Sequence, residues 1–195
     1  TPPAGERSMS VAPVVIVLAA GAGRRFIASG AKTNKLDTLL HHQTVLGHVL
    51  TTVKASGLGC YVVRPAGGTA GIGESIALGV KATANAGGWL ILPADLPLIR
   101  SATLRQVALE LENKPIVVPF WQQQAGHPVG FAGEYFTPLS QLTGDCGGRE
   151  IVRAARKKGL VLDCPVTDRG IVQDIDTLAD LHLARHFLPT YSVDD

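Results

Sequence analysis

The sequence predicts a three-layer α/β/α domain, a Rossmann-like arrangement with a mainly parallel mixed sheet. Short apolar segments rich in β-branched residues alternate with helical patterns along the chain, and this order requires crossover connections between parallel strands. The chain has 195 residues, of which 46% are hydrophobic and 17% charged. That composition can build one α/β core and excludes a disordered chain.

The expected elements can be placed by residue number. Strands are predicted at 14–20, 60–63, 89–92, 116–119, 161–166 and 171–175. Helices are predicted at 43–55, 73–84, 101–111, 150–158 and 178–187, with Ser101 as the N-cap of the third and a short structured turn at 134–142.

Neither an internal repeat nor a long linker divides the chain, so we expect residues 9–195 to form a single domain. Residues 1–8 precede the single methionine, Met9. We expect these residues to be a disordered lead-in or an expression remnant.

Composition excludes several classes of function. A net charge of +2 with both signs mixed gives no basic surface for nucleic acid. The apolar run at 11–20 is too short to span a membrane. The three cysteines, Cys60, Cys146 and Cys164, lack metal-ligand spacing. We therefore expect a cytoplasmic protein with reduced thiols.

A glycine-rich segment, VVIVLAAGAGRRF at 14–26, joins an apolar strand to two arginines. Backbone N–H groups of the turn, a following helix and the guanidinium of Arg25 together suit a polyphosphate. A dinucleotide-binding loop would need a third glycine where Phe26 stands, and the Walker A pattern is absent from the sequence. The segment is therefore a phosphate-binding loop of another kind, or a tight strand–helix turn with surface arginines.

Two acidic segments could supply a metal site. Asp95 follows a predicted strand in LPADLPL at 92–98, where a carboxylate can hold Mg²⁺ against a triphosphate. Asp174 and Asp176 lie two apart on a predicted strand and would share one face, with Thr177 as the cap of the next helix. Turn and cap chemistry alone also explains aspartates at such positions.

Together these motifs resemble the molybdenum cofactor nucleotidyltransferases, the MobA-like NTP transferase family, and within it the cytidylyltransferase (MocA-like) branch. The resemblance implies the nucleotide-diphospho-sugar transferase type of fold. It is carried by LAAGAGRRF at 18–26, GIGES at 71–75, LPADLP at 92–97, GHPVGF at 126–131, LTGDCGGR at 142–149 and DIDT at 174–177.

The resemblance also implies a role for each matching residue. Catalytic roles fall on Arg25, Lys35 and Asp95. Nucleotide binding falls on Leu18, Ala19, Ala20, Gly21, Ala22, Gly23, Gly73, Ser75 and Ala94. Acceptor binding falls on His127, Asp145 and Arg149. The metal ligands would be Asp95 with Asp176, or with Asp174 as second choice, and the ion Mg²⁺ with Mn²⁺ as an alternative.

Two departures from the family pattern stand out. The connection at 27–34 is longer than the family's, so Lys32 competes with Lys35 as the phosphate-binding lysine. A βα unit before GIGES is missing, so we expect the sheet to be one strand shorter on that edge. The sequence leaves open whether Cys146 has a role.

The implied reaction transfers CMP from CTP to molybdenum-bound molybdopterin, giving the cytosine dinucleotide and pyrophosphate, with transient contact with a molybdoenzyme. Ala20 and Ala94 favour CTP over GTP by the same resemblance. The alternatives are a guanylyltransferase, a nucleotidyltransferase acting on another phosphorylated acceptor, and a non-catalytic molybdenum cofactor carrier.

Overall fold

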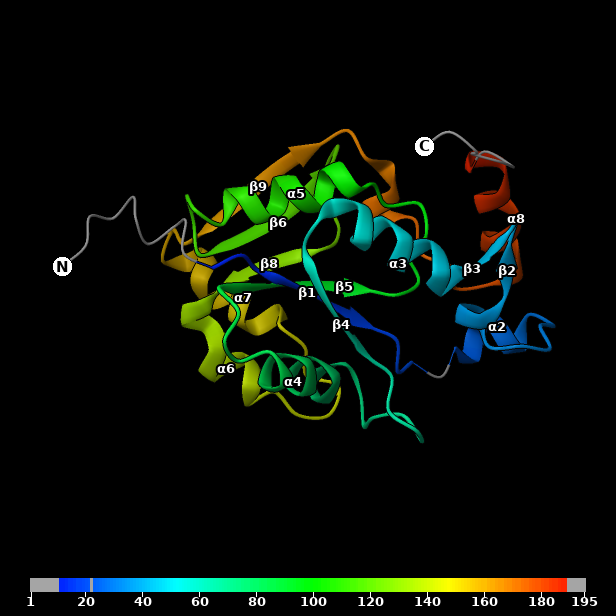
Figure 1. Cartoon of the computed structure of the whole chain (residues 1–195), viewed down its shortest axis with the longest axis horizontal. Helices are drawn as coiled ribbons and strands as arrows, with labels where there is room; N and C mark the ends of the chain where they lie inside the picture. The colour runs from blue at the N-terminus through cyan, green and yellow to red at the C-terminus, as the bar shows by residue number, and fades with distance from the viewer. Residues whose placement is uncertain (1–10, 22, 189–195) are drawn as a thin grey trace.

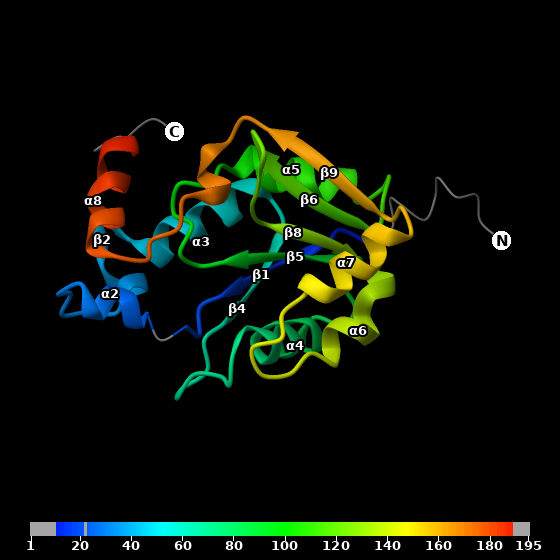
Figure 2. The same ribbon diagram turned by 180° about the vertical axis from the view of Figure 1, so that it is seen from behind.

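The computed structural model describes residues 11–21 and 23–188. The expected lead-in at 1–8 and Ala22 of the glycine-rich loop lie outside the described residues. Within the described chain, a seven-stranded mixed sheet lies between two layers of helices (Figures 1 and 2). This confirms the predicted three-layer α/β class.

The sheet has the order β4-β1-β5-β8-β6-β7, with β9 pairing on the other side of β6. The β1–β4, β1–β5 and β6–β9 ladders are parallel, and β7 and β8 run antiparallel to their neighbours. β4 forms one edge, as expected if no further βα unit precedes GIGES. The strands are β1 (Val14–Leu18), β4 (Gly59–Val63), β5 (Gly88–Pro93), β6 (Ile116–Trp121), β7 (Gln124–Ala125), β8 (Val129–Ala132) and β9 (Val161–Val166).

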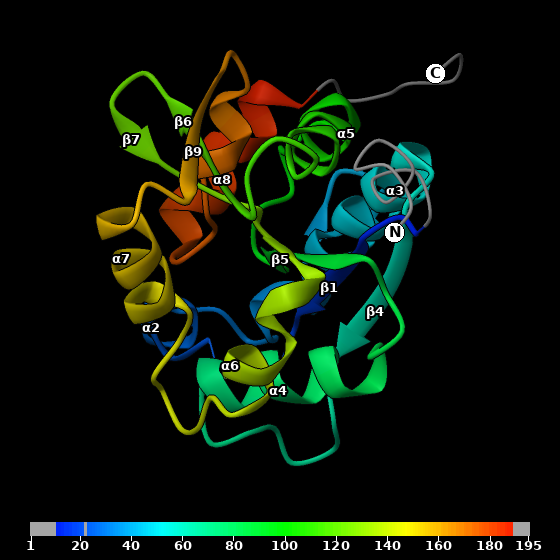
Figure 3. The same ribbon diagram turned by 90° about the vertical axis from the view of Figure 1, so that its left-hand side faces the viewer.

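Side chains alternate between two apolar clusters, one on each face of the sheet. On β1, the buried Val15 and Val17 belong to one cluster and Ile16 to the other, as the period of two in a strand requires. Helices α3 (Val45–Ser56) and α5 (Ser101–Glu110) cover the first face, and α4 (Ile72–Ala82), α6 (Phe136–Ser140) and α7 (Arg149–Lys157) cover the second (Figure 3).

A smaller assembly lies beyond the carboxyl end of β1 (Figure 1). It contains α2 (Arg24–Ala28), the hairpin of β2 (Leu39–Leu40) and β3 (Gln43–Thr44), and α8 (Leu178–Phe187). The Leu178 N–H donates to Ser29 Oγ at 3.0 Å and joins α8 to α2. Thr177 caps α8 in a capping box with Asp180, which confirms the predicted cap. Short 3₁₀ turns complete the chain: η1 (Lys35–Asp37), η2 (Gly133–Tyr135) and η3 (Arg169–Val172).

Two local predictions were wrong. The strand expected at 171–175 is instead η3 followed by irregular chain, because Gly170 packs against the Leu98 carbonyl so closely that an added Cβ would lie 2.4 Å from it. Ser101 is the first residue of α5 and Arg100 the N-cap. The capping carboxylate comes from the buried Asp168, which accepts from the Arg100 N–H at 2.9 Å.

The helices of residues 11–21 and 23–188 are all too short or too polar to cross a membrane.

Candidate active site

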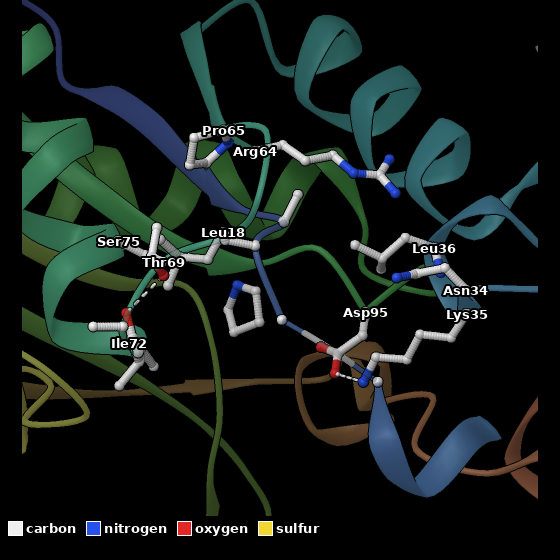
Figure 4. A pocket seen from close by; sticks show the side chains of 18 of the residues that line it. Leu18, Asn34, Lys35, Leu36, Arg64, Pro65, Thr69, Ile72, Ser75 and Asp95 are labelled. Atoms are coloured by element: carbon white, nitrogen blue, oxygen red, sulfur yellow. Dashed lines mark hydrogen bonds and ion pairs between the residues drawn. The ribbon is translucent and has the colours of Figure 1, made fainter. Parts of the chain in front are cut away.

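A cavity of about 800 Å³ opens at the carboxyl ends of β1, β4 and β5. Ligands bind at this edge in open α/β sheets, and the volume suits a small molecule. Its lining combines the glycine-rich loop after β1, the segment after β4, and the side chains of Lys35 and Asp95 (Figure 4). Residues of four predicted motifs, LAAGAGRRF, GIGES, LPADLP and LTGDCGGR, therefore line this cavity.

The glycine-rich loop starts from two fixed points. The Ala19 N–H donates to the Val63 carbonyl, and the Ala94 N–H donates to the Leu18 carbonyl, each at 3.0 Å. Gly23 has φ +61°, a left-handed conformation in which glycine is favoured. A Cβ added to Gly21 would meet no atom within 4 Å, so its backbone faces open space. Of the predicted nucleotide residues, Leu18, Ala19, Ala20, Gly21 and Gly23 line the cavity.

Lys35 is the lysine that reaches the cavity. Its Nζ lies 2.9 Å from Asp95 Oδ2, and the two side chains are only 13% and 21% exposed. Lys32, the rival in the sequence, is exposed and is absent from the described lining.

Arg25 forms a second ion pair with a predicted metal ligand. Its Nη1 lies 2.9 Å from Asp176 Oδ2, and the Arg25 side chain is 80% exposed. The pair is therefore accessible and weak, since exposed ion pairs contribute little to stability. In this state each candidate phosphate-binding cation is compensated by a candidate metal-binding carboxylate.

The segment 173–176 passes across the end of β5 instead of forming a strand. The Ile175 N–H donates to the Asp95 carbonyl at 2.9 Å and fixes this crossing. Asp174 lines a cavity that also includes Asp95, and partial burial together with the Asp95 carboxylate raises the pKa of Asp174. Asp176 is paired with Arg25, whereas Asp174 lines the cavity with Asp95. The two carboxylates therefore do not share one strand face, and that prediction was wrong.

This second cavity, of about 380 Å³, adjoins the first, and Pro93 and Asp95 line both. His127 and Gln124 complete its polar lining. Burial lowers the pKa of His127, against an opposing effect of the Asp95 carboxylate, so the imidazole is neutral near pH 7. The position of His127 beside the first cavity suits the predicted acceptor side.

The loop at 142–149 packs against the start of α4. The Gly144 carbonyl accepts from the N–H groups of Gly73 at 2.8 Å and Glu74 at 3.2 Å. A Cβ on Gly73 would lie 2.3 Å from the Cys146 carbonyl oxygen. Packing against this loop therefore explains the glycine at 73.

The remaining predicted residues differ in their placement. Ser75 lines the larger cavity, and its hydroxyl lies 2.7 Å from that of Thr69. Asp145 lines the same cavity, while neither described lining includes Arg149 or Arg25. Ala94 is buried behind the cavity wall. Cys146 is an exposed free thiol.

Sequence reasoning missed Arg64, Asn34 and Thr69, which all line the larger cavity. Arg64 forms a two-bond ion pair with Asp37, at 2.9 and 2.7 Å. The signal available was an arginine directly after an apolar strand, followed by a Gly-Gly pair.

The carboxylates fit a divalent ion that is shared with a substrate. Within 11–21 and 23–188, no group of three or more His, Cys, Asp or Glu side chains could hold a metal by itself. Asp95 and Asp174 line one cavity, and Mg²⁺ in nucleotide enzymes is typically held by one or two carboxylates together with substrate phosphates.

Known proteins share this sequence pattern and this fold. The family described as MobA-like NTP transferase domain matches residues 15–159. The chain belongs to this family. It is therefore a nucleotidyltransferase of the MobA-like type. Among curated protein sequences, none matches this NTP transferase significantly.

Solved structures share the fold of this NTP transferase. Rv0371c from Mycobacterium tuberculosis H37Rv is 23% identical, with a TM-score of 0.72 over 90% of this chain and 98% of that chain. A manganese complex of Rv0371c is 21% identical, with a TM-score of 0.68 over 91% and 100% of the two chains.

Two further proteins have the same architecture. A nucleotidyl transferase from Methanothermobacter is 19% identical, with a TM-score of 0.75 over 90% and 97%. Molybdopterin-guanine dinucleotide biosynthesis protein A from Archaeoglobus fulgidus is 17% identical, with a TM-score of 0.59 over 89% and 97%. The predicted nucleotide-diphospho-sugar transferase type of fold is thus correct.

Proposed function

We propose that the protein is a Mg²⁺-dependent nucleotidyltransferase that transfers CMP from CTP to molybdenum-bound molybdopterin, releasing pyrophosphate. The observation that carries the proposal is the Lys35–Asp95 pair of 2.9 Å beside the glycine-rich loop, where two cavities meet. One cavity can hold the triphosphate and the other the acceptor. Asp95 faces both.

The reaction requires an acceptor phosphate oxygen to attack the α-phosphorus while pyrophosphate leaves. The protein contributes mainly positioning and charge stabilisation. Backbone N–H groups of the loop, Arg25 and Lys35 would hold the triphosphate, and Asp95 with Asp174 or Asp176 would hold the ion. A bound divalent ion supplies neutralisation of the charge that develops on the phosphates.

Both ion pairs must exchange partners in this scheme. Lys35 moves from Asp95 to a phosphate, and Arg25 moves from Asp176 to a phosphate. The released carboxylates then become available to the ion. Metal and nucleotide should therefore bind cooperatively, because each releases the partner that the other needs.

The choice of CTP rests on Ala20 and Ala94, which distinguish the cytidylyl from the guanylyl branch by resemblance. Ala94 is 1% exposed and packs behind the loop, so it would act through the shape of the wall. Ala20 lines the cavity. GTP is the alternative nucleotide, and Mn²⁺ the alternative ion.

Molybdopterin as acceptor rests on the GHPVGF and LTGDCGGR segments. His127 lies in the second cavity, which supports an acceptor role for the first segment. Asp145 lines the nucleotide cavity, so we assign it to the boundary between the two ligands. A different phosphorylated acceptor is the main alternative.

A non-catalytic carrier of the molybdenum cofactor is the other alternative. It has no use for Lys35 and Asp95 paired beside a phosphate loop. Pyrophosphate release, measured with CTP, GTP and ATP in the presence of Mg²⁺ and molybdenum-bound molybdopterin, tests the proposal. We expect release with CTP, and none with Asp95→Ala, which should remain folded.

A further inference from the structure

The 3₁₀ turn η1 bridges the ends of two strands. Lys35, its first residue, contacts Asp95, two residues beyond β5. Asp37, its last residue, contacts Arg64, the residue after β4. Because β4 and β5 flank β1 in the sheet, the turn links both neighbours of the strand that carries the glycine-rich loop.

The geometry of a 3₁₀ turn explains how one short element reaches both sides. With three residues per turn, residues two apart point in different directions. The turn is also ordered from within: Asn34 Oδ1 accepts from the Leu36 N–H at 2.9 Å, and the Leu36 side chain is buried in the core. The chain before it, 29–34, has no helix or strand. The preceding chain therefore does not fix the position of Lys35, so contacts of the turn itself contribute to it.

The Asp37–Arg64 contact is suited to holding the turn, and with it Lys35, in place. Two parallel bonds of 2.9 and 2.7 Å give it a fixed geometry. Figure 4 shows the Arg64 side chain reaching from its strand end toward the side of the cavity where Asn34 and Leu36 lie. The guanidinium is thus engaged with the turn, although Arg64 also lines the cavity.

We propose that Arg64 and Asp37 are positioning residues, which hold η1 across the strand ends so that Lys35 faces the triphosphate. This inference rests on the proposed nucleotidyl transfer. The rival role for Arg64 is direct binding of a phosphate. The two roles predict opposite results for Asp37→Asn: a freed Arg64 would strengthen nucleotide binding if it were a direct ligand, and a released turn would weaken it.

The test compares Asp37→Asn, Arg64→Met and the double variant with the unaltered chain. The matched control is Asp163→Asn, which breaks the similarly exposed Arg156–Asp163 pair of 2.7 Å elsewhere on the surface. Two quantities are measured: the affinity for CTP with Mg²⁺ by calorimetry, and amide hydrogen exchange at residues 36–38 without nucleotide.

We expect Asp37→Asn and Arg64→Met each to weaken CTP binding about three- to fivefold, the range open to a partly exposed pair. The double variant should lose no more than either single one, because both remove the same contact. Exchange at 36–38 should accelerate by about the same factor. The control should change neither quantity.

Tighter CTP binding in Asp37→Asn, or additive losses in the double variant, would overturn the inference. If the unaltered chain binds no nucleoside triphosphate, the proposed function fails. The exchange data then decide the positioning role of the pair by themselves: faster exchange at 36–38 in Asp37→Asn supports it, and unchanged exchange refutes it.

Discussion

The Lys35 ammonium group lies 2.9 Å from the Asp95 carboxylate, at the junction of the two cavities. Lys35 is paired with the carboxylate that a metal ion would need. Asp95 is paired with the ammonium group that a bound phosphate would need. The pair therefore keeps a largely buried charge satisfied in the ligand-free protein. In the proposed reaction, a triphosphate would take over the lysine and thereby free Asp95 for the ion.

Replacing this lysine should separate the two effects. Lys35→Met should lower kcat/KM by at least about 100-fold, because one charge directed at the transition state is lost. The same change should strengthen Mn²⁺ binding in the absence of nucleotide, because Asp95 is released. Activity assays and Mn²⁺ titration followed by electron paramagnetic resonance measure both. Lys32→Met, at the exposed rival position, serves as the control and should alter neither.

Two variants test whether Asp174 or Asp176 is the proposed second metal ligand beside Asp95. Asp174 lines the cavity that contains Asp95, whereas Asp176 is paired with Arg25. We expect Asp174→Asn to raise the Mg²⁺ concentration for half-maximal activity about tenfold or more, the scale of one lost charge-assisted contact. Asp176→Asn should have a smaller effect. The reverse order of the two variants would assign the role to Asp176, which the family resemblance favours.

Steric limits at the start of α4 predict a stability difference between two glycine variants. Gly73→Ala would place a Cβ 2.3 Å from the Cys146 carbonyl, whereas a Cβ on Gly21 meets nothing within 4 Å. We expect Gly73→Ala to reduce the free energy of unfolding by about 1–3 kcal/mol. Gly21→Ala should leave it nearly unchanged. Urea unfolding measures both, and equal stabilities would show that the loop at 142–149 yields without cost.

Burial lowers the pKa values of two histidines, and we therefore expect the protein to lose stability in mild acid. Burial is the main cause for His127 and for His48. The unfolded chain therefore takes up protons first, so stability should fall as the pH drops from about 6.5 toward the lowered pKa values. His127→Asn should flatten this part of the profile in thermal unfolding measured between pH 7 and pH 5. The exposed His182→Asn is the control, and an unchanged profile in His127→Asn would contradict the assignment.

The sheet and the loop after β1 could be predicted because their signals are local. β5, with Trp89 and Leu92 fully buried, is a continuous apolar run, as strands covered on both faces are. The position of Asp95 after that run then follows from the topology. The cap at Thr177 is likewise a signal within four residues.

The rest depends on contacts between distant residues. The apolar residues Ile171, Val172 and Ile175 resemble a strand, but the hydrogen bond from Ile175 to the Asp95 carbonyl and the packing of Gly170 on Leu98 determine their path. Local pattern likewise could not choose between Lys32 and Lys35, because the connection before them has no periodicity. Arg64 was missed because its partner, Asp37, lies on another element.

The most direct test of the account is transfer of labelled CMP. The protein is incubated with α-phosphate-labelled CTP, Mg²⁺ and molybdenum-bound molybdopterin, and labelled dinucleotide and released pyrophosphate are quantified together. The account predicts equal amounts of the two products, lost in Lys35→Met and Asp95→Ala. Absence of both products with CTP, GTP and ATP alike would contradict it.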